Sequence, residues 1–421
     1  MPDLLTLLLQ IAIILILARV MGWLFRKIQQ PQVIGEMVAG ILLGPSLLGW
    51  LAPGVSAALF PPESLGYLNA LSLIGLLVFM FLVGLELDSG VLLGQGRAMF
   101  LTSQAGIVAP FALGALLAVY LYPRLAADGV ALGHFALFMG AAMSITAFPV
   151  LARILIERGL IKTRLGSVAI ACAAVGDVQG WCILAGVVVL ARAGHTSIPF
   201  WGTLLGSVVY VLGMWYGVRP LAHKFESAFR QRHAVTQDMM ALIFVLVLAS
   251  AWITEWLGVH ALFGAFMVGA VMPRDHHFTA ALTEKLEHMA VVLLLPIFFA
   301  FNGLRTSVGL VNGAQLWFYC ALIILVAILG KFGGVTAVAR ATGISWREAT
   351  SLGILMNTRG LMELVILNIG LDIGVLSPTL FTMMVIMALV TTFMTSPLLQ
   401  WVYFARLWPG RVTEGAAERV L

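Results

Sequence analysis

The stretch AAVGDVQGW, residues 173–181, decides how the rest of this chain is interpreted. It lies inside an apolar segment, residues 165–191, in which Asp177 is the sole formal charge. An ionised carboxylate at the centre of a bilayer costs at least ~2.5 kcal/mol, so a chain keeps one only where a partner, water or a bound cation offsets that cost. The pattern predicts that Asp177 is a site at which a monovalent cation and a proton compete.

The composition around this segment is that of a polytopic membrane protein. Of the 421 residues, 61% are hydrophobic and 10% are charged, whereas soluble domains carry about 25% charged residues. The first apolar run, residues 4–25, is too long for the core of a signal peptide and predicts a spanning helix. We therefore expect an integral protein of the cell (inner) membrane, with no nucleic-acid partner.

Apolar runs of roughly 20 residues, the length that crosses a bilayer, recur along the chain. They predict an all-α fold with 13 transmembrane helices at about 3–25, 31–50, 66–87, 97–122, 132–156, 163–192, 197–218, 237–256, 258–273, 288–305, 315–340, 347–372 and 378–403. Seventeen of the 24 basic residues fall in loops on one side and three on the other. This asymmetry predicts an external N-terminus and a cytoplasmic C-terminus. We expect one transport domain, 1–421, with no C-terminal regulatory domain.

The chain also repeats itself at a separation of seven helices. The matched stretches are GEMVAG (35–40) with GAFMVG (264–269), GLE (84–86) with GLR (303–305), and SITAFP (144–149) with MNTRG (356–360). An odd separation places the copies in opposite orientations, which predicts inverted repeats at about 1–192 and 237–405 with a linker helix at 197–218. Interrupted helices at matching positions of such repeats indicate a transporter's binding site.

The third match predicts two broken helices that cross near the membrane midplane. Backbone groups freed there are tolerated only where protein or a water-filled cavity satisfies them. Arg359 and Glu363 are four residues apart on one helical face, and could pair with each other or neutralise the facing helix ends. We expect Ser144, Asn357 and Thr358 to support the same crossing.

A second charged centre is Lys331, in the stretch GKFGG at 330–334 of the eleventh span. We expect its ammonium group to pair with Asp177 when no cation is bound, and to be displaced when a cation or proton arrives. Coulomb attraction is much stronger at low dielectric than in water. Protonation of the carboxylate and binding of the cation would therefore be coupled.

These motifs together resemble the monovalent cation/proton antiporter superfamily, in the branch (CPA2) of the glutathione-gated potassium efflux systems and the plant cation/proton exchangers. The stretches that carry the resemblance are SITAFPVLAR (144–153), Gly176-Asp177, LPIFF (295–299), Gly330-Lys331 and NTRGL (357–361). The resemblance implies a core domain with crossed helices that moves against a dimerisation domain, and hence a homodimer. It places the essential aspartate of the family at Asp177, its threonine at Thr146 and its lysine at Lys331.

The chain departs from the family pattern at Gly176. Electrogenic members have two adjacent carboxylates, and the resemblance therefore implies electroneutral exchange of one K+ or Na+ for one proton. Thr146 and nearby backbone carbonyls would complete the cation shell, and no cofactor is implied. Because the nucleotide-binding domain of the potassium efflux systems has no counterpart, regulation of that kind would need a separate subunit.

Two other functions stay open at this point. A cation channel would need no proton coupling, and a sodium-coupled symporter of an organic solute on the same fold would need a solute cavity. An enzyme is disfavoured because neither an HExxH nor a GxSxG motif occurs.

Overall fold

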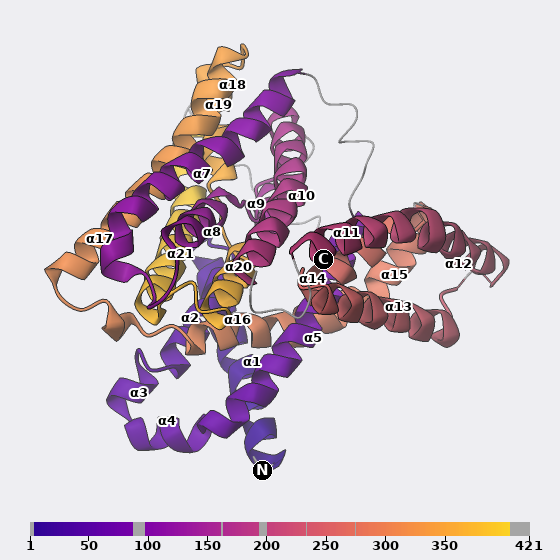
Figure 1. Cartoon of the computed structure of the whole chain (residues 1–421), viewed down its shortest axis with the longest axis horizontal. Coiled ribbons are helices and arrows are strands. Elements are labelled where there is room, and N and C mark those ends of the chain that lie inside the picture. Colours follow the sequence, from indigo (N-terminus) through magenta and orange to yellow (C-terminus); the bar gives the residue numbers. More distant parts are fainter. Residues whose placement is uncertain are drawn as a thin grey trace.

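The computed structural model of the chain is built from helices, and each predicted span has a counterpart in it (Figure 1). It describes residues 4–86, 97–160, 163–192, 200–232, 234–273 and 275–404. Within these residues, nine helices are long and apolar enough to cross a membrane, and shorter apolar helices lie at Leu132–Ser144, Arg164–Ala173 and Ala261–Val271. The prediction of an all-α membrane fold is confirmed.

The first half of the chain contains α1 to α10. Their bounds are α1 (Leu4–Lys27), α2 (Gln32–Leu43), α3 (Leu48–Leu51), α4 (Pro53–Leu59), α5 (Pro62–Glu86), α7 (Arg97–Leu125), α8 (Leu132–Ser144), α9 (Phe148–Glu157) and α10 (Arg164–Arg192). α11 (Phe200–Leu212) then continues through the π-helical segment η1 (Gly213–Val218) into α12 (Arg219–Arg232). The predicted linker helix corresponds to α11 and η1.

The second half begins at α13. Its elements are α13 (Gln237–Trp256), α14 (Ala261–Val271), α15 (His276–Met289), η2 (Ala290–Leu294), α16 (Leu295–Leu304), η3 (Val308–Leu310), α17 (Ala314–Ile328), η4 (Leu329–Gly333), α18 (Gly334–Ala341), α19 (Trp346–Met356), α20 (Leu361–Asp372), α21 (Pro378–Leu399) and η5 (Gln400–Phe404). The tenth predicted span begins later than the observed helix. α15, η2 and α16 follow one another without a break. Asp275 caps the start of α15 by accepting hydrogen bonds from the backbone amides of His277 and Phe278.

The helices pack as two groups. The scaffold helices, α1, α2, α5, α13, α14 and α16, contact one another extensively. The crossing helices, α7 to α10 and α17 to α21, form the second group, most of which lies in the upper left of Figure 1. α16 with α20 and α2 with α21 are places where the two groups meet.

Glycines bring the scaffold helices into backbone contact. A Cβ atom at Gly40 of α2 would overlap the backbone of Ala300 in α16, and one at Gly303 of α16 would overlap the backbone of α2. A Cβ at Gly84 of α5 would overlap Phe266 in α14, and one at Gly269 of α14 would overlap Phe81 in α5. Small residues are what allows apolar helices to approach this closely.

The two glycine contacts are the same contact with the halves of the chain exchanged. In the predicted repeat, Gly40 matches Gly269 and Gly84 matches Gly303. The contact of Gly40 with the Gly303 helix is thus equivalent to that of Gly269 with the Gly84 helix. This correspondence supports the repeat, whose inverted orientation stays a prediction.

Candidate functional site: the crossing of two broken helices

Two helices break near their middle and meet at the breaks. α8 ends at Ser144 and α9 begins at Phe148, with Ile145 in an extended conformation between them. α19 ends at Met356 and α20 begins at Leu361. The backbone amide of Ala147 donates to the carbonyl of Thr358 at 3.1 Å, and the breaks are thereby joined.

Cationic side chains serve the end of α8. The Arg359 guanidinium donates through Nη1 to the carbonyl of Ala142 at 3.1 Å and through Nη2 to that of Met143 at 2.7 Å. Lys331, fully buried, donates through Nζ to the carbonyl of Ser144. The last carbonyls of a helix lack intrahelical partners and carry partial negative charge. Two fixed positive charges therefore satisfy this helix end.

Arg359 is also paired with Glu363, one turn further along. Nη1 of Arg359 lies 2.5 Å from Oε2 of Glu363, and the two side chains are 0% and 1% exposed. A buried ion pair is tolerated only when further hydrogen bonds satisfy it, and here the carbonyls of α8 supply them. Among the described residues, Oε1 of Glu363 and Nε of Arg359 have no hydrogen-bond partner.

Hydroxyl groups serve the end of α19. Thr358 Oγ1 donates to the carbonyl of Leu355 at 2.7 Å, and Thr146 Oγ1 donates to that of Met356 at 3.3 Å. The Asn357 side chain is buried, and its Oδ1 has no hydrogen-bond partner among the described residues. This helix end keeps oxygen atoms that are not matched to a cationic group of the described chain.

Threonine 392 is a supporting residue that the sequence did not single out. Its Oγ1 accepts a hydrogen bond from the Arg359 backbone amide at 2.9 Å and donates to the Arg359 carbonyl at 2.6 Å. It therefore fixes the backbone at the break from α21. The sequence signal was available, because Thr391, Thr392 and Thr395 cluster inside an apolar span.

α10 passes beside the crossing and carries the predicted ion site. It contacts α8, α9 and α19, and a Cβ atom at Gly180 would lie 3.1 Å from Cγ1 of Ile145 in the first break. Gly176 is buried, yet no described atom lies within 4 Å of the position its Cβ would take. The side chain of Asp177 lies outside the described part of the structure. Its role and its pairing with Lys331 therefore stay predictions.

Another acidic side chain, that of Glu36, is buried elsewhere in the structure. Glu36 is buried in α2 and accepts a hydrogen bond from Nε2 of Gln32 at 2.7 Å. The Glu86 side chain and all of Asp88 lie outside the described residues. No three His, Cys, Asp or Glu side chains gather as a metal-ion site in the part of the chain that was described.

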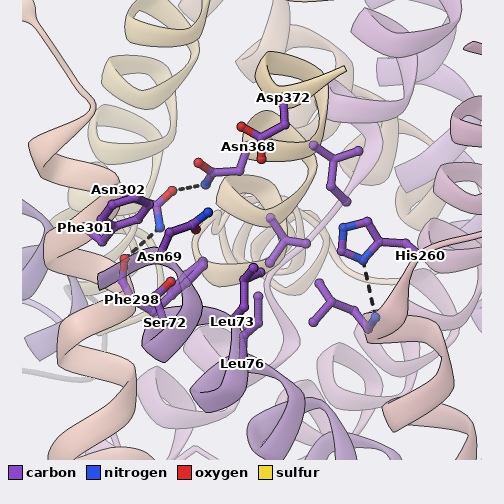
Figure 2. A pocket seen from close by; sticks show the side chains of 13 residues that line it. Asn69, Ser72, Leu73, Leu76, His260, Phe298, Phe301, Asn302, Asn368 and Asp372 are labelled. Carbon is purple, nitrogen blue, oxygen red and sulfur yellow. Dashed lines mark hydrogen bonds between the residues drawn. The ribbon is translucent and has the colours of Figure 1, made fainter. Parts of the chain in front are cut away.

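A small polar cavity lies between α5, α14, α16 and α20 (Figure 2). Its volume is about 30 Å³, which exceeds the space needed for one water molecule. Asn69 and Ser72 of α5 line it together with Asn302, Asn368 and Asp372. The cavity therefore lies where scaffold helices face α20, one of the crossing helices.

Comparison with known proteins agrees with this arrangement. The family described as "Sodium/hydrogen exchanger, transmembrane" matches residues 13–404. The Na+/H+ antiporter NhaS4 of Synechocystis sp. is 46% identical over 402 residues, which cover 95% of this chain and 98% of that protein. Cation/H+ antiporter 17 of Arabidopsis thaliana and K+/H+ antiporter 1 of Saccharomyces cerevisiae are 42% and 35% identical. The matches cover 94% of this chain but only 48% and 46% of those two relatives.

A solved structure shows the same fold. The sodium proton antiporter MjNhaP1 from Methanocaldococcus jannaschii superposes with a TM-score of 0.65, covering 96% of this chain and 98% of that chain at 16% sequence identity. The two broken helices and the matched motifs thus belong to a fold known from a transporter. The chain is a member of the sodium/hydrogen exchanger family.

Proposed function

We propose that this protein exchanges a monovalent cation, K+ or Na+, for a proton by alternating access, with Asp177 as the shared site. The observation that carries the proposal is the crossing itself. One broken end is neutralised by Arg359 and Lys331, the other keeps oxygen atoms without a cationic partner among the described residues, and α10 brings Asp177 alongside. Relatives named for Na+/H+ and for K+/H+ exchange are consistent with either cation.

The residues divide the task as follows. Asp177 holds the cation or the proton in turn, and Thr146 and carbonyls of the break complete the cation shell. Lys331 neutralises the carboxylate when both are absent. Five supporting residues stabilise the two helix breaks: Arg359, Glu363, Asn357, Thr358 and Ser144. Loaded states move readily, because a bound cation or proton offsets the charge of the carboxylate at membrane depth.

Gly176 sets the proposed stoichiometry. With no second carboxylate beside Asp177, one proton is exchanged for one monovalent cation, and transport moves no net charge. We further propose that the protein is a homodimer of the cell inner membrane, with its N-terminus outside.

Exchange in proteoliposomes that contain a pH-sensitive dye tests the proposal. We expect Na+ or K+ added outside to drive protons out of acid-loaded vesicles. In a Na+ titration, clamping the membrane voltage with K+ and valinomycin should leave the rate of proton efflux unchanged. Li+ is titrated as a third cation. Cation flux without counter-movement of protons would indicate a channel. Sodium uptake that an organic solute stimulates would indicate a symporter.

Asp177→Asn is the decisive variant in the same assay. It removes the exchangeable charge with little change of shape, and we expect exchange to fall to the level of empty vesicles. Size-exclusion profile and thermal unfolding midpoint in detergent check that the variant is folded. A folded Asp177→Asn protein with normal exchange would overturn the assignment of this residue.

A further inference from the structure

A polar group joins α16 of the scaffold to α20 of the crossing helices. Nη2 of Arg305 lies 2.6 Å from Oδ1 of Asp372, and Nη1 of Arg305 donates to Oδ1 of Asn368 at 2.8 Å. Nδ2 of Asn368 donates in turn to Oδ1 of Asn302 (Figure 2). Asn302 and Arg305 lie on α16 or directly after it, and Asn368 and Asp372 lie in the last turns of α20.

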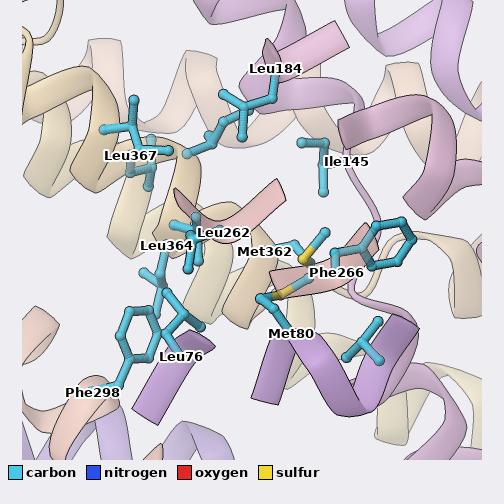
Figure 3. Packing of buried hydrophobic residues seen from close by; sticks show 14 of the residues in the cluster. Leu76, Met80, Ile145, Leu184, Leu262, Phe266, Phe298, Met362, Leu364 and Leu367 are labelled. Atoms are coloured by element: carbon cyan, nitrogen blue, oxygen red, sulfur yellow. The ribbon is translucent and has the colours of Figure 1, made fainter. Parts of the chain in front are cut away.

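Deeper in the molecule the same two groups of helices meet through apolar side chains. Leu76 and Phe298 from the scaffold belong to one buried cluster with Met362, Leu364 and Leu367 of α20 (Figure 3). Apolar contact is non-directional, so it permits sliding and does not fix one register. The hydrogen bonds at the Arg305 end are directional, and they select one position of α20 against α16.

The polar group is also weak enough to break during a transport cycle. The side chains of Arg305 and Asp372 are 24% and 53% exposed, so water reaches both. An exposed ion pair of this kind contributes little to stability. Asn302 is buried and lines the cavity together with Asn69 and Ser72.

α20 connects this group rigidly to the crossing. The helix begins directly after the break, carries Glu363 in its first turn and ends at Asp372. Twelve helical residues span about 18 Å. Any shift of the crossing relative to α16 is therefore transmitted to the contact between Arg305 and Asp372.

We infer that Arg305, Asp372, Asn368 and Asn302 form a gate on the side of the membrane that the charge asymmetry predicts to be external. The inference rests on the proposed exchange function. In the observed conformation these four residues link α16 to α20 beside the cavity. When α20 moves away from α16, Arg305 is withdrawn. The Asp372 carboxylate and the two amide oxygens then line an open route for the cation.

Thiol labelling of the cavity tests the gate without any measurement of transport. Ser72→Cys is placed in a background in which Cys172, Cys182 and Cys320 are replaced, and its reaction with a membrane-impermeant cationic methanethiosulfonate is timed in intact cells. We expect Arg305→Ala to raise the labelling rate about fivefold, the change equivalent to ~1 kcal/mol at 25 °C. Arg124→Ala is the matched control, because Arg124 contacts Tyr120 within its own helix and does not join the two groups. It should leave the rate unchanged.

A covalent clamp provides the second arm. The double variant with Arg305→Cys and Asp372→Cys is measured first in its reduced form, and that exchange rate is the reference. The double variant should lose most of this exchange when a short bifunctional thiol reagent, cleavable by reduction, joins the two cysteines. It should regain exchange after reduction. Equal labelling of Ser72→Cys with and without Arg305→Ala, or full exchange by the clamped protein, would overturn the gate. If Arg305→Ala raises labelling but the unmodified protein shows no exchange, the gate stands and the proposed function fails.

Discussion

The ends of α8 and α19 carry the same partial charge but have different partners. At α8, Arg359 and Lys331 donate to three successive carbonyls. At α19, the hydroxyls of Thr358 and Thr146 donate to two. The two repeats thus provide similar helix ends, but charged side chains bind the carbonyls of α8 and hydroxyl groups bind those of α19.

This difference indicates where a transported cation is accepted. Arg359 and Lys331 already occupy the carbonyls at the end of α8, so these oxygen atoms are not open to a cation. At the end of α19, the Thr146 hydroxyl, the Met356 carbonyl and Oδ1 of Asn357, which has no hydrogen-bond partner among the described residues, are candidate oxygen ligands. Monovalent and divalent hard cations are bound through oxygen atoms of this kind. We therefore expect the cation to bind on the α19 side of the crossing.

The largest effect is expected from removing the charge that serves α8. Arg359→Met leaves Glu363 buried without its partner and two carbonyls without donors, a class of change that costs about 3–5 kcal/mol. We expect a strongly lowered midpoint of thermal unfolding in detergent. Arg359→Met combined with Glu363→Leu should lose less, because no buried charge is then unpaired. Wild-type stability of Arg359→Met would show that α8 does not depend on this charge.

Lys331→Gln makes the two helix ends more alike, and a smaller effect is expected. Loss of one charged hydrogen bond to the Ser144 carbonyl corresponds to about 1.5–3 kcal/mol of stability. Exchange should persist with an altered dependence on pH, because a fixed positive charge near the predicted ion site has been removed. Initial exchange rates measured across a pH series check this, with Lys331→Arg as the variant that keeps the charge. A pH profile identical to that of the wild type would argue against coupling of Lys331 to the site.

The smallest effect is expected at the α19 end, where removal of the Thr146 hydroxyl and removal of the Thr358 hydroxyl should have different results. Thr146→Ala removes a proposed cation ligand, and we expect the apparent KM for the cation to rise about fivefold, equivalent to a hydrogen-bond-sized loss of ~1 kcal/mol. Thr146→Ser should restore it. Thr358→Ala removes a hydroxyl that is committed to the Leu355 carbonyl, so its apparent KM should stay near that of the wild type. Equal changes in the two alanine variants would mean that Thr146 has only a capping role.

Much of the fold could be predicted because its signals are local. Apolar runs located the spans, and SITAFP and MNTRG located both breaks. The part missed, α15, had no such signal, because the polar residues of this 14-residue helix resemble those of a loop. The residues that support the crossing could be predicted one by one, because charged and capping residues are easily recognised within an apolar span.

The partners within the site could not be predicted, because they are distant in the chain. Lys331 and the Ser144 carbonyl are 187 residues apart, and Arg359 and the Met143 carbonyl are 216 apart. A sequence shows that a buried ammonium group needs an acceptor, but it does not show which backbone oxygen the fold supplies. For the same reason Arg305 and Asp372, 67 residues apart, were not linked in advance.

The glycine contacts of the scaffold have a consequence for how the protein is made. Each contact joins one helix of the first half to one of the second, Gly40 with Gly303 and Gly84 with Gly269. During synthesis, α2 and α5 enter the membrane more than 170 residues before α14 and α16 are translated. During that interval, the glycine faces of α2 and α5 are not yet covered by α16 and α14. The halves can complete neither contact separately, so the scaffold assembles late, as one unit, after most of the chain has left the ribosome.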